Sequence, residues 1–197
     1  MSKLLKRRPL VRQLLEKRAT MLVVAGLGAP AWDITAAGDH PNSFPMWGAM
    51  GGSTMIGLGL ALAQPKRKVL VITGDGEMLM GLGSLATIAV QKPDNLYVVV
   101  LDNEHYGETG MQETHTGHGV DLAGMAKAAG FKHALNVETQ KEADKLTKMI
   151  RKGDGPLFAQ VKIDPEKLAL VLPPREGSYI KNRFRISVLG PNAVHDE

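Results

Sequence analysis

The chain has 197 residues, of which 44% are apolar and 22% are charged, as expected for a folded domain with a sizeable core. It contains no cysteine, which excludes disulfides, thiolate metal sites, a cysteine nucleophile and cysteine-ligated iron–sulfur clusters. The formal net charge is +4, but no basic run is interleaved with aromatic residues, so we expect no nucleic-acid binding.

The apolar segments are too short to span a membrane. The longest run, residues 55–63, is well below the roughly 20 residues that a spanning helix needs. Basic residues followed by the apolar segment 21–31 resemble an export signal, but the segment in front of it is long and amphipathic. We therefore favour a helix followed by a buried strand, and we expect a cytoplasmic protein with no membrane contact.

Taken in chain order, the first half of the sequence predicts a helix, a strand, a loop and a second helix. Leucines at helical spacing among charges indicate an amphipathic helix over residues 3–18, and residues 21–25 read as a short buried strand. Residues 41–52 are rich in glycine and proline and predict a loop. Ser53 is a suitable N-cap for a helix that ends at Ala63. Gly57 and Gly59 inside this helix each cost about 1 kcal/mol relative to alanine, which close packing against a neighbour would justify.

The second half continues the alternation. Apolar, β-branched runs predict strands at residues 69–73, 97–101, 134–137 and 157–163. Helices are predicted at residues 79–90 and 122–129, and behind a Thr139 N-cap up to residue 151. Residues 103–119 are a long polar segment without apolar periodicity. The pattern predicts a single doubly wound α/β domain with a parallel sheet over residues 1–165, followed by a basic C-terminal tail at 166–197.

Two polar motifs follow neighbouring strands of this pattern. Gly74-Asp75-Gly76 comes directly after the strand at 69–73, and Asp102-Asn103 comes after the strand at 97–101. Because the carboxyl ends of parallel strands meet at one edge of a sheet, we expect Asp75 and Asn103 to lie close together. Their oxygens suit a divalent cation such as Mg²⁺, and the glycines allow backbone N–H groups to approach a phosphate at a helix start. The sequence therefore predicts a magnesium–diphosphate site.

These motifs, together with the helix and strand between them, resemble the cofactor signature of the thiamine-diphosphate enzymes. The likeness covers roughly residues 44–161 and is carried by GDGEMLMGLGSLATI at 74–88 and LDNEHYGETGMQET at 101–114. It is similar to the diphosphate-binding (PP-type) half of the 2-oxo acid decarboxylases that act on sulfopyruvate or phosphonopyruvate. The family usually has two asparagines where this chain has Asp102-Asn103, but the ligand is the second of the pair.

The resemblance implies a role for each residue of the site. The implied Mg²⁺ ligands are Asp75, Asn103 and the backbone carbonyl of His105. The residues whose backbone would hold the thiamine diphosphate are Gly74, Gly76, Glu77, Tyr106 and Gly107. The Gly48 carbonyl would accept a hydrogen bond from the aminopyrimidine, and Met50 would wedge between the two rings of the cofactor.

The resemblance also implies a partner. In this family a glutamate on a separate pyrimidine-binding domain polarises the cofactor, and this chain supplies only one set of alternating elements. Four glutamates lie beside the diphosphate signature and are poor candidates for that role, namely Glu77, Glu104, Glu108 and Glu113. We therefore expect half an active site, completed by a pyrimidine-binding α subunit that brings the activating glutamate, with a small 2-oxo acid as substrate.

Two further groups of residues have open roles. His115 and His118 are candidate catalytic residues that would donate protons or contact an acidic substrate group, but solvated loop histidines are an equal alternative. Arg175, Arg183 and Arg185 would suit an anionic substrate or a partner, although we favour a solvated basic tail.

Three interpretations of the function follow. The leading one is a carboxy-lyase subunit that binds thiamine diphosphate and Mg²⁺. The second is the β subunit of another thiamine-diphosphate enzyme, either a carboligase or a 2-oxo acid oxidoreductase, although the absence of cysteine counts against cluster-dependent oxidoreductases. The third is a non-catalytic cofactor-binding protein.

Overall fold

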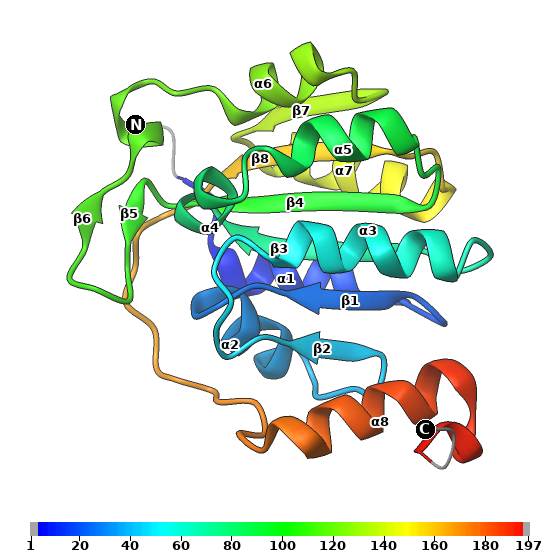
Figure 1. Ribbon diagram of the computed structural model, residues 1–197. Coiled ribbons are helices and arrows are strands. Elements are labelled where there is room, and N and C mark those ends of the chain that lie inside the picture. Colours follow the sequence, from blue (N-terminus) through cyan, green and yellow to red (C-terminus); the bar gives the residue numbers. More distant parts are fainter. Residues whose placement is uncertain (1–3, 195–197) are drawn as a thin grey trace.

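Six parallel strands form the central sheet of the computed structural model, which describes residues 4–194 (Figure 1). Their order across the sheet is β2-β1-β3-β4-β8-β7. The strands are β1 (Leu22–Ala25), β2 (Ser43–Pro45), β3 (Val69–Gly74), β4 (Leu96–Asp102), β7 (His133–Val137) and β8 (Leu157–Lys162). The prediction of a doubly wound α/β domain with a parallel sheet is confirmed.

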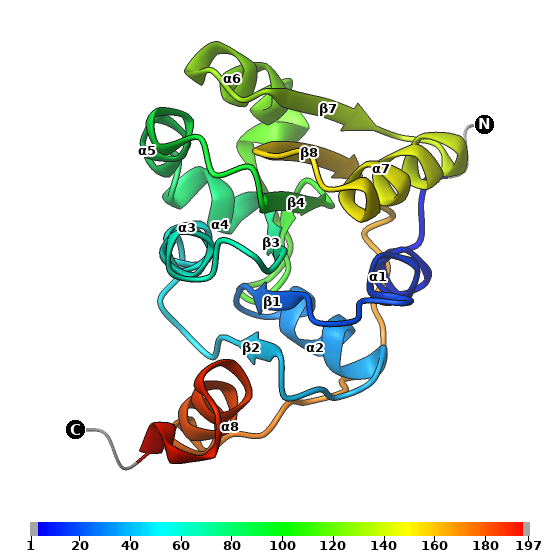
Figure 2. The same ribbon diagram turned by 90° about the vertical axis from the view of Figure 1, so that its right-hand side faces the viewer.

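Helices cover both faces of this sheet (Figure 2). One face carries α1 (Arg7–Leu15), α2 (Ala29–Ala36) and α7 (Gln140–Lys152), and the other carries α3 (Ser53–Ala63), α5 (Ser84–Gln91) and α6 (Leu122–Ala129). Successive side chains of a strand point to opposite faces, so Leu70 and Ile72 of β3 enter the first core while Val69 and Val71 enter the second. Burial on both faces explains why these strands are continuous apolar runs.

The strand order reverses at β1, between β2 and β3. The chain leaves β1 towards β2 on one side and returns as β3 on the other side of β1. Open α/β sheets bind ligands at such a reversal of strand order. The short helix α4 (Asp75–Met80) begins at this point, directly behind β3.

The long polar segment after β4 has structure of its own. It forms the antiparallel pair β5 (His105–Tyr106) and β6 (Gln112–Glu113), followed by the 3-10 turn η1 (His115–His118). Figure 1 shows this segment beyond the carboxyl end of β4, beside α4. The polar segment therefore lies at the same edge as the Gly74-Asp75-Gly76 turn.

Several predicted helix boundaries are wrong. The single helix expected over residues 79–90 is two helices, α4 and α5, separated at residues 81–83. The N-cap of α3 is Gly52 and makes no side-chain cap bond, so the Ser53 prediction is wrong, whereas the Thr139 cap of α7 is confirmed by a full capping box with Glu142. Helix α1 starts at Arg7 instead of residue 3, which lies outside the described residues. The elements α2 and β2 were not predicted.

Part of the C-terminal segment is helical, which the prediction of a solvated tail did not foresee. Residues 177–189 form helix α8 (Gly177–Leu189), whose Ile180 and Phe184 are buried. Phe184 packs on Phe44 of β2 with ring centroids 5.3 Å apart, and Arg183 forms a 2.6 Å ion pair with Asp39. Residues 163–176 connect β8 to α8, and we call them the connecting segment. Lys6 binds Asp164 and Glu166 of this segment, Arg8 donates to its Ala169 carbonyl, and Trp47 donates to its Pro174 carbonyl.

The segment that resembled an export signal is part of the fold. Residues 22–25 are the fully buried strand β1, and Ala29 and Pro30 begin α2. Within residues 4–194, no helix combines the length and apolar character needed to cross a bilayer.

Candidate metal and cofactor site

Asp75 lies at the carboxyl end of β3, in the first turn of α4. Gly74 pairs with Leu101 of β4, so Asp75 and Asp102 follow at neighbouring positions of the sheet edge. The Asp75 side chain is buried, and its Oδ2 accepts a hydrogen bond from the Thr114 hydroxyl (2.5 Å) and lies 3.3 Å from the Thr116 hydroxyl. Thr114 and Thr116 come from the polar segment, which therefore closes over the carboxylate.

The electrostatic surroundings of Asp75 fit a cation. Burial raises the pKa of the Asp75 carboxyl from 3.8 to about 6, and the nearby Asp102 adds to this, while the Thr114 hydrogen bond opposes it. The other buried aspartates, Asp33 and Asp102, form ion pairs with arginine or lysine, whereas the side-chain partners of Asp75 in the described chain are hydroxyls. A buried carboxylate without a cationic partner is a group that a divalent ion would neutralise.

Asn103 and His105 form one tight turn directly after β4. Asn103 Oδ1 accepts the His105 backbone N–H at 3.1 Å, and the His105 ring Nδ1 lies 2.7 Å from the Asn103 carbonyl. No three His, Asp or Glu side chains gather as a metal cluster anywhere in the described part of the chain. A cation here would therefore depend on amide, backbone and ligand oxygens beside Asp75, which is the donor set that Mg²⁺ accepts.

Three of the predicted cofactor residues converge at the start of α4. A side chain at Gly76 would overlap the Tyr106 ring, whose Cδ1 would be only 2.7 Å from the added Cβ, and would lie 3.5 Å from the Met50 methyl group. The loop that carries Met50 is held close to α4, because the Gly51 backbone carbonyl would also overlap any side chain at Gly81. The structure thus brings the Met50 loop, α4 and β5 together around one backbone turn.

The Glu77 side chain has a structural role that sequence reasoning missed. Its two carboxylate oxygens accept the backbone N–H groups of Leu27 (3.0 Å) and Ser53 (3.3 Å). It therefore joins the end of β1 and the start of α3 to α4, and it takes the place of the missing Ser53 cap. Gly26 leaves room for this contact, because any side chain there would overlap the Glu77 carboxylate.

The remaining predicted residues lie around this centre. Gly74 ends β3, and Gly48 and Gly107 lie in exposed loops. His115 and His118 are exposed on η1, where His118 Nε2 is 3.2 Å from Glu113 Oε2. Their catalytic role stays a prediction, since the side chains of this segment that turn inward are those of Thr114 and Thr116.

A polar network around the fully buried Asp102 side chain, beside the site, was also missed. Asp102 Oδ2 accepts hydrogen bonds from Gln160 (2.6 Å) and Lys162 (2.9 Å), and its Oδ1 accepts them from Thr116 (2.7 Å) and the Glu104 N–H (3.1 Å). The one signal in the sequence was that Asp102 replaces an asparagine usual in the resembled family.

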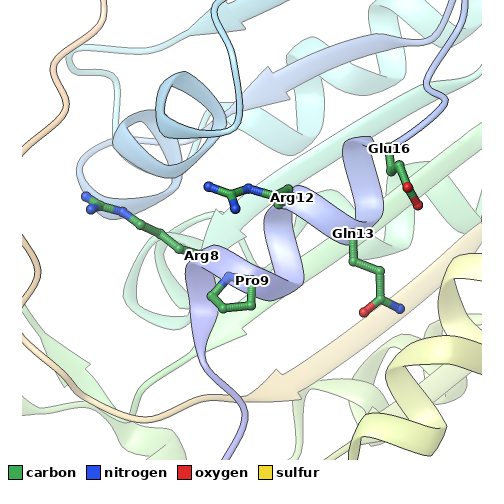
Figure 3. A pocket seen from close by; sticks show the side chains of 5 residues that line it. All are labelled: Arg8, Pro9, Arg12, Gln13 and Glu16. Atoms are coloured by element: carbon green, nitrogen blue, oxygen red, sulfur yellow. The ribbon is translucent and has the colours of Figure 1, made fainter.

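A separate hollow of about 470 Å³ runs along α1, lined by Arg8, Pro9, Arg12, Gln13 and Glu16 (Figure 3). Figure 3 shows these side chains pointing in different directions along the helix, and none of the predicted site residues belongs to the lining. Arg8 is already tied to Asp33 and the Ala169 carbonyl. We therefore assign the hollow no role in the site.

Comparisons with known proteins show which proteins the chain resembles. The chain is 38% identical over 169 residues to the sulfopyruvate decarboxylase subunit beta of Methanothermobacter thermautotrophicus, covering 86% of this chain and 88% of the relative. It is 35% identical over 185 residues to the phosphonopyruvate decarboxylase of Streptomyces viridochromogenes, covering 93% of this chain but 46% of the relative.

The fold itself recurs in solved structures. Benzoylformate decarboxylase from Polynucleobacter necessarius superposes with a TM-score of 0.70 at 21% identity, covering 84% of this chain and 34% of that one. Residues 28–161 match the family described as "Thiamine pyrophosphate enzyme, C-terminal TPP binding domain". The resemblance drawn from the two motifs is thereby confirmed, and the chain belongs to the thiamine pyrophosphate enzyme family, in its C-terminal, TPP-binding domain.

Proposed function

We propose that this chain is the thiamine diphosphate- and Mg²⁺-binding subunit of a decarboxylase that acts on a small anionic 2-oxo acid such as sulfopyruvate or phosphonopyruvate. The observation that carries the proposal is the buried Asp75 carboxylate, which has hydroxyl partners in place of a cation and follows β3 at the sheet edge where the neighbouring strand β4 also ends. The relatives named as sulfopyruvate and phosphonopyruvate decarboxylases support the reaction class.

In this proposal the chain's own residues bind and orient the cofactor. Asp75, the Asn103 amide oxygen and the His105 carbonyl would hold Mg²⁺. The first-turn N–H groups of α4 lack intrahelical acceptors, and together with those of β5 they would hold the diphosphate. The Gly48 carbonyl and Met50 would orient the two rings. When bound, thiamine diphosphate supplies the nucleophilic carbon and the electron sink for decarboxylation.

The activating glutamate is proposed to come from another chain. Three of the four glutamates near the site have partners of their own, since Glu77 binds backbone N–H groups, Glu104 pairs with Lys162 and Glu113 lies beside His118. The fourth, Glu108, lies against Gly28. The name of the M. thermautotrophicus relative, a subunit beta, supports a two-subunit assembly.

Exposed apolar side chains around the site support an interface there. Met50 is 37% exposed beside Gly76, Met80 is 67% exposed beside Gly51, and Met111 is 42% exposed near Gly107. Exposed methionines gathered at one edge are typical of a surface that another protein covers. We propose that the pyrimidine-binding subunit covers this edge and completes the active site.

The proposal is tested by cofactor binding to the full chain. Calorimetric titration with thiamine diphosphate is expected to give binding that requires Mg²⁺, and Asp75→Ala is expected to abolish it because the variant lacks the charged ligand. Asp144→Ala, which changes an exposed aspartate of α7, is the control and is expected to bind like the wild type. Unchanged affinity in Asp75→Ala would show that the metal assignment is wrong.

A second experiment tests the two-subunit arrangement. The purified chain with thiamine diphosphate and Mg²⁺ is expected to release no CO₂ from 2-oxo acids. Co-expression with a pyrimidine-binding subunit is expected to restore CO₂ release, and screening sulfopyruvate, phosphonopyruvate and pyruvate then identifies the substrate. Robust turnover by the chain alone would contradict the proposed partner.

A further inference from the structure

Asp102 is a buried charge at the end of β4, and the donors around it satisfy both of its oxygens. Its side chain has no exposed surface, and Lys162 is the cation that compensates it at 2.9 Å. Lys162 is held in turn by Glu104 at 2.6 Å. Removing one partner of a buried ion pair is costly because it leaves the other charge uncompensated. An uncharged residue at position 102, such as asparagine, would need no lysine at position 162.

The same carboxylate fixes the polar segment at two points. Asp102 Oδ1 accepts the backbone N–H of Glu104 at 3.1 Å and the hydroxyl of Thr116 at 2.7 Å. Between these points, the Thr114 N–H donates to the Glu104 carbonyl at 2.8 Å. Thr114 is therefore held between two residues that Asp102 anchors.

The anchored segment places a hydrogen-bond donor on Asp75. Each threonine has one hydroxyl hydrogen, so the shortest contacts assign the Thr114 hydrogen to Asp75 and the Thr116 hydrogen to Asp102. The two hydroxyl oxygens are 2.9 Å apart. A displacement of Thr116 would therefore also move the Thr114 hydroxyl and the Asp75 carboxylate that this hydroxyl orients.

We propose that Asp102 and Lys162 are positioning residues for the cation site, because the ion pair fixes Glu104 and Thr116 and so sets the orientation of Asp75. This inference rests on the proposed function, since it concerns the same metal ligand. Residues that orient a metal ligand commonly change metal affinity about 10- to 100-fold when they are substituted.

The first test is a double-mutant cycle on urea unfolding of the full chain without metal. Lys162→Met is expected to lower the unfolding midpoint, because Asp102 becomes an uncompensated buried charge. Combining it with Asp102→Asn is expected to recover most of the loss, because the neutral amide needs no cation. Lys132→Met, which breaks the exposed ion pair with Asp154, is the matched control and is expected to cause little change. Additive losses in the double variant would overturn the inference.

The second test measures the Mg²⁺ concentration that half-saturates thiamine diphosphate binding, by calorimetry. Lys162→Met and Thr116→Val are each expected to raise this concentration at least about tenfold, and Asp102→Asn combined with Lys162→Met is expected to return it towards the wild-type value. Thr147→Val removes another buried threonine hydroxyl, one that donates to the Ala143 carbonyl on α7, and is expected to leave the value unchanged.

The possible outcomes separate the two proposals. If the wild type binds the cofactor with Mg²⁺ but these variants require no more Mg²⁺ than it does, the positioning role is refuted while the proposed function stands. If the wild type shows no Mg²⁺-dependent binding at all, the proposed function fails, and the positioning role fails with it. Midpoint recovery in the double variant together with a shifted Mg²⁺ requirement in Thr116→Val supports the inference.

Discussion

At the scale of single residues, the buried carboxylates of this protein differ in how their charge is compensated. Asp33 is paired with Arg7 at 2.7 Å, Asp102 is paired with Lys162, and Glu77 accepts two backbone N–H groups. Asp75 has the Thr114 hydroxyl as its donor, with the Thr116 hydroxyl 3.3 Å away, and neutral hydroxyls compensate a full charge least well. The residue with the weakest internal compensation is therefore the one at the proposed cation site.

The raised pKa of Asp75 predicts a stability cost that grows with pH. Well below pH 3.8 both the folded and unfolded chains keep the proton and no cost arises, whereas above the folded value of about 6 the folded chain bears the full penalty of a buried charge. In Asp75→Asn the penalty is absent. The free energy of unfolding of the variant, relative to wild type, should therefore rise between pH 4 and pH 7 by on the order of 2–3 kcal/mol.

The measurement for this prediction is urea unfolding of both proteins across that pH range without Mg²⁺. Asp144→Asn, which makes the same change at an exposed position, is measured alongside as the control. A constant difference between Asp75→Asn and the wild type would contradict the predicted cost of the buried charge.

At the scale of elements, the two glycines inside helix α3 lie in different surroundings, one against the sheet and one in solvent. A side chain at Gly57 would overlap Val71 of β3, so this glycine allows α3 to lie close to the sheet. Gly59 is exposed, and a Cβ there would meet no other atom within 4 Å. The expectation that close packing justifies both glycines is therefore right for Gly57 and wrong for Gly59.

This difference predicts opposite effects of the same substitution. Gly59→Ala should stabilise the protein by about 0.5–1 kcal/mol, because alanine has the higher helix propensity and there is room for its methyl group. Gly57→Ala should destabilise it by about 1–3 kcal/mol, because the buried sheet cannot yield space without strain. Each variant is the control for the other in urea unfolding, and changes of the same sign in both would refute the packing argument.

At the scale of the whole molecule, the connecting segment (residues 163–176) and α8 extend the fold beyond the last strand of the sheet. Figure 1 shows the chain running from β8 past the carboxyl edge to α8, which lies beside β2 at the sheet edge. An edge strand as short as β2 gains from such a neighbour, because its outer side is otherwise open. The packing of Phe184 on Phe44 attaches this last helix to the second core.

This attachment predicts that α8 unfolds together with the rest of the chain. Phe184→Ala should lower the free energy of unfolding by about 3 kcal/mol, because it removes a buried aromatic ring. Leu189→Ala, at a position of the same helix that is 62% exposed, should change it by less than about 0.5 kcal/mol. Unfolding followed by circular dichroism provides the measurement. A loss as small in Phe184→Ala as in Leu189→Ala would mean that α8 adds nothing to the cooperative fold.

The sequence by itself determined the fold class and the two motifs of the site. Apolar β-branched runs and helical periodicity are local signals, so they identified most strands and helices, and a family signature identified Asp75 and Asn103. The elements it missed, such as β2 and α8, are short or lack strong periodicity, and they are stabilised by contacts with distant residues, as Phe184 is by Phe44.

Only the tertiary structure decided how the charges of the site are compensated. Whether a carboxylate meets a lysine, a hydroxyl or a backbone N–H depends on which segments pack together, and the partners of Asp75 and Asp102 come from residues 114–116 and from β8. No local pattern in the sequence reports such contacts, because the free energy of a buried charge is set by its surroundings in space and not by its neighbours in the chain.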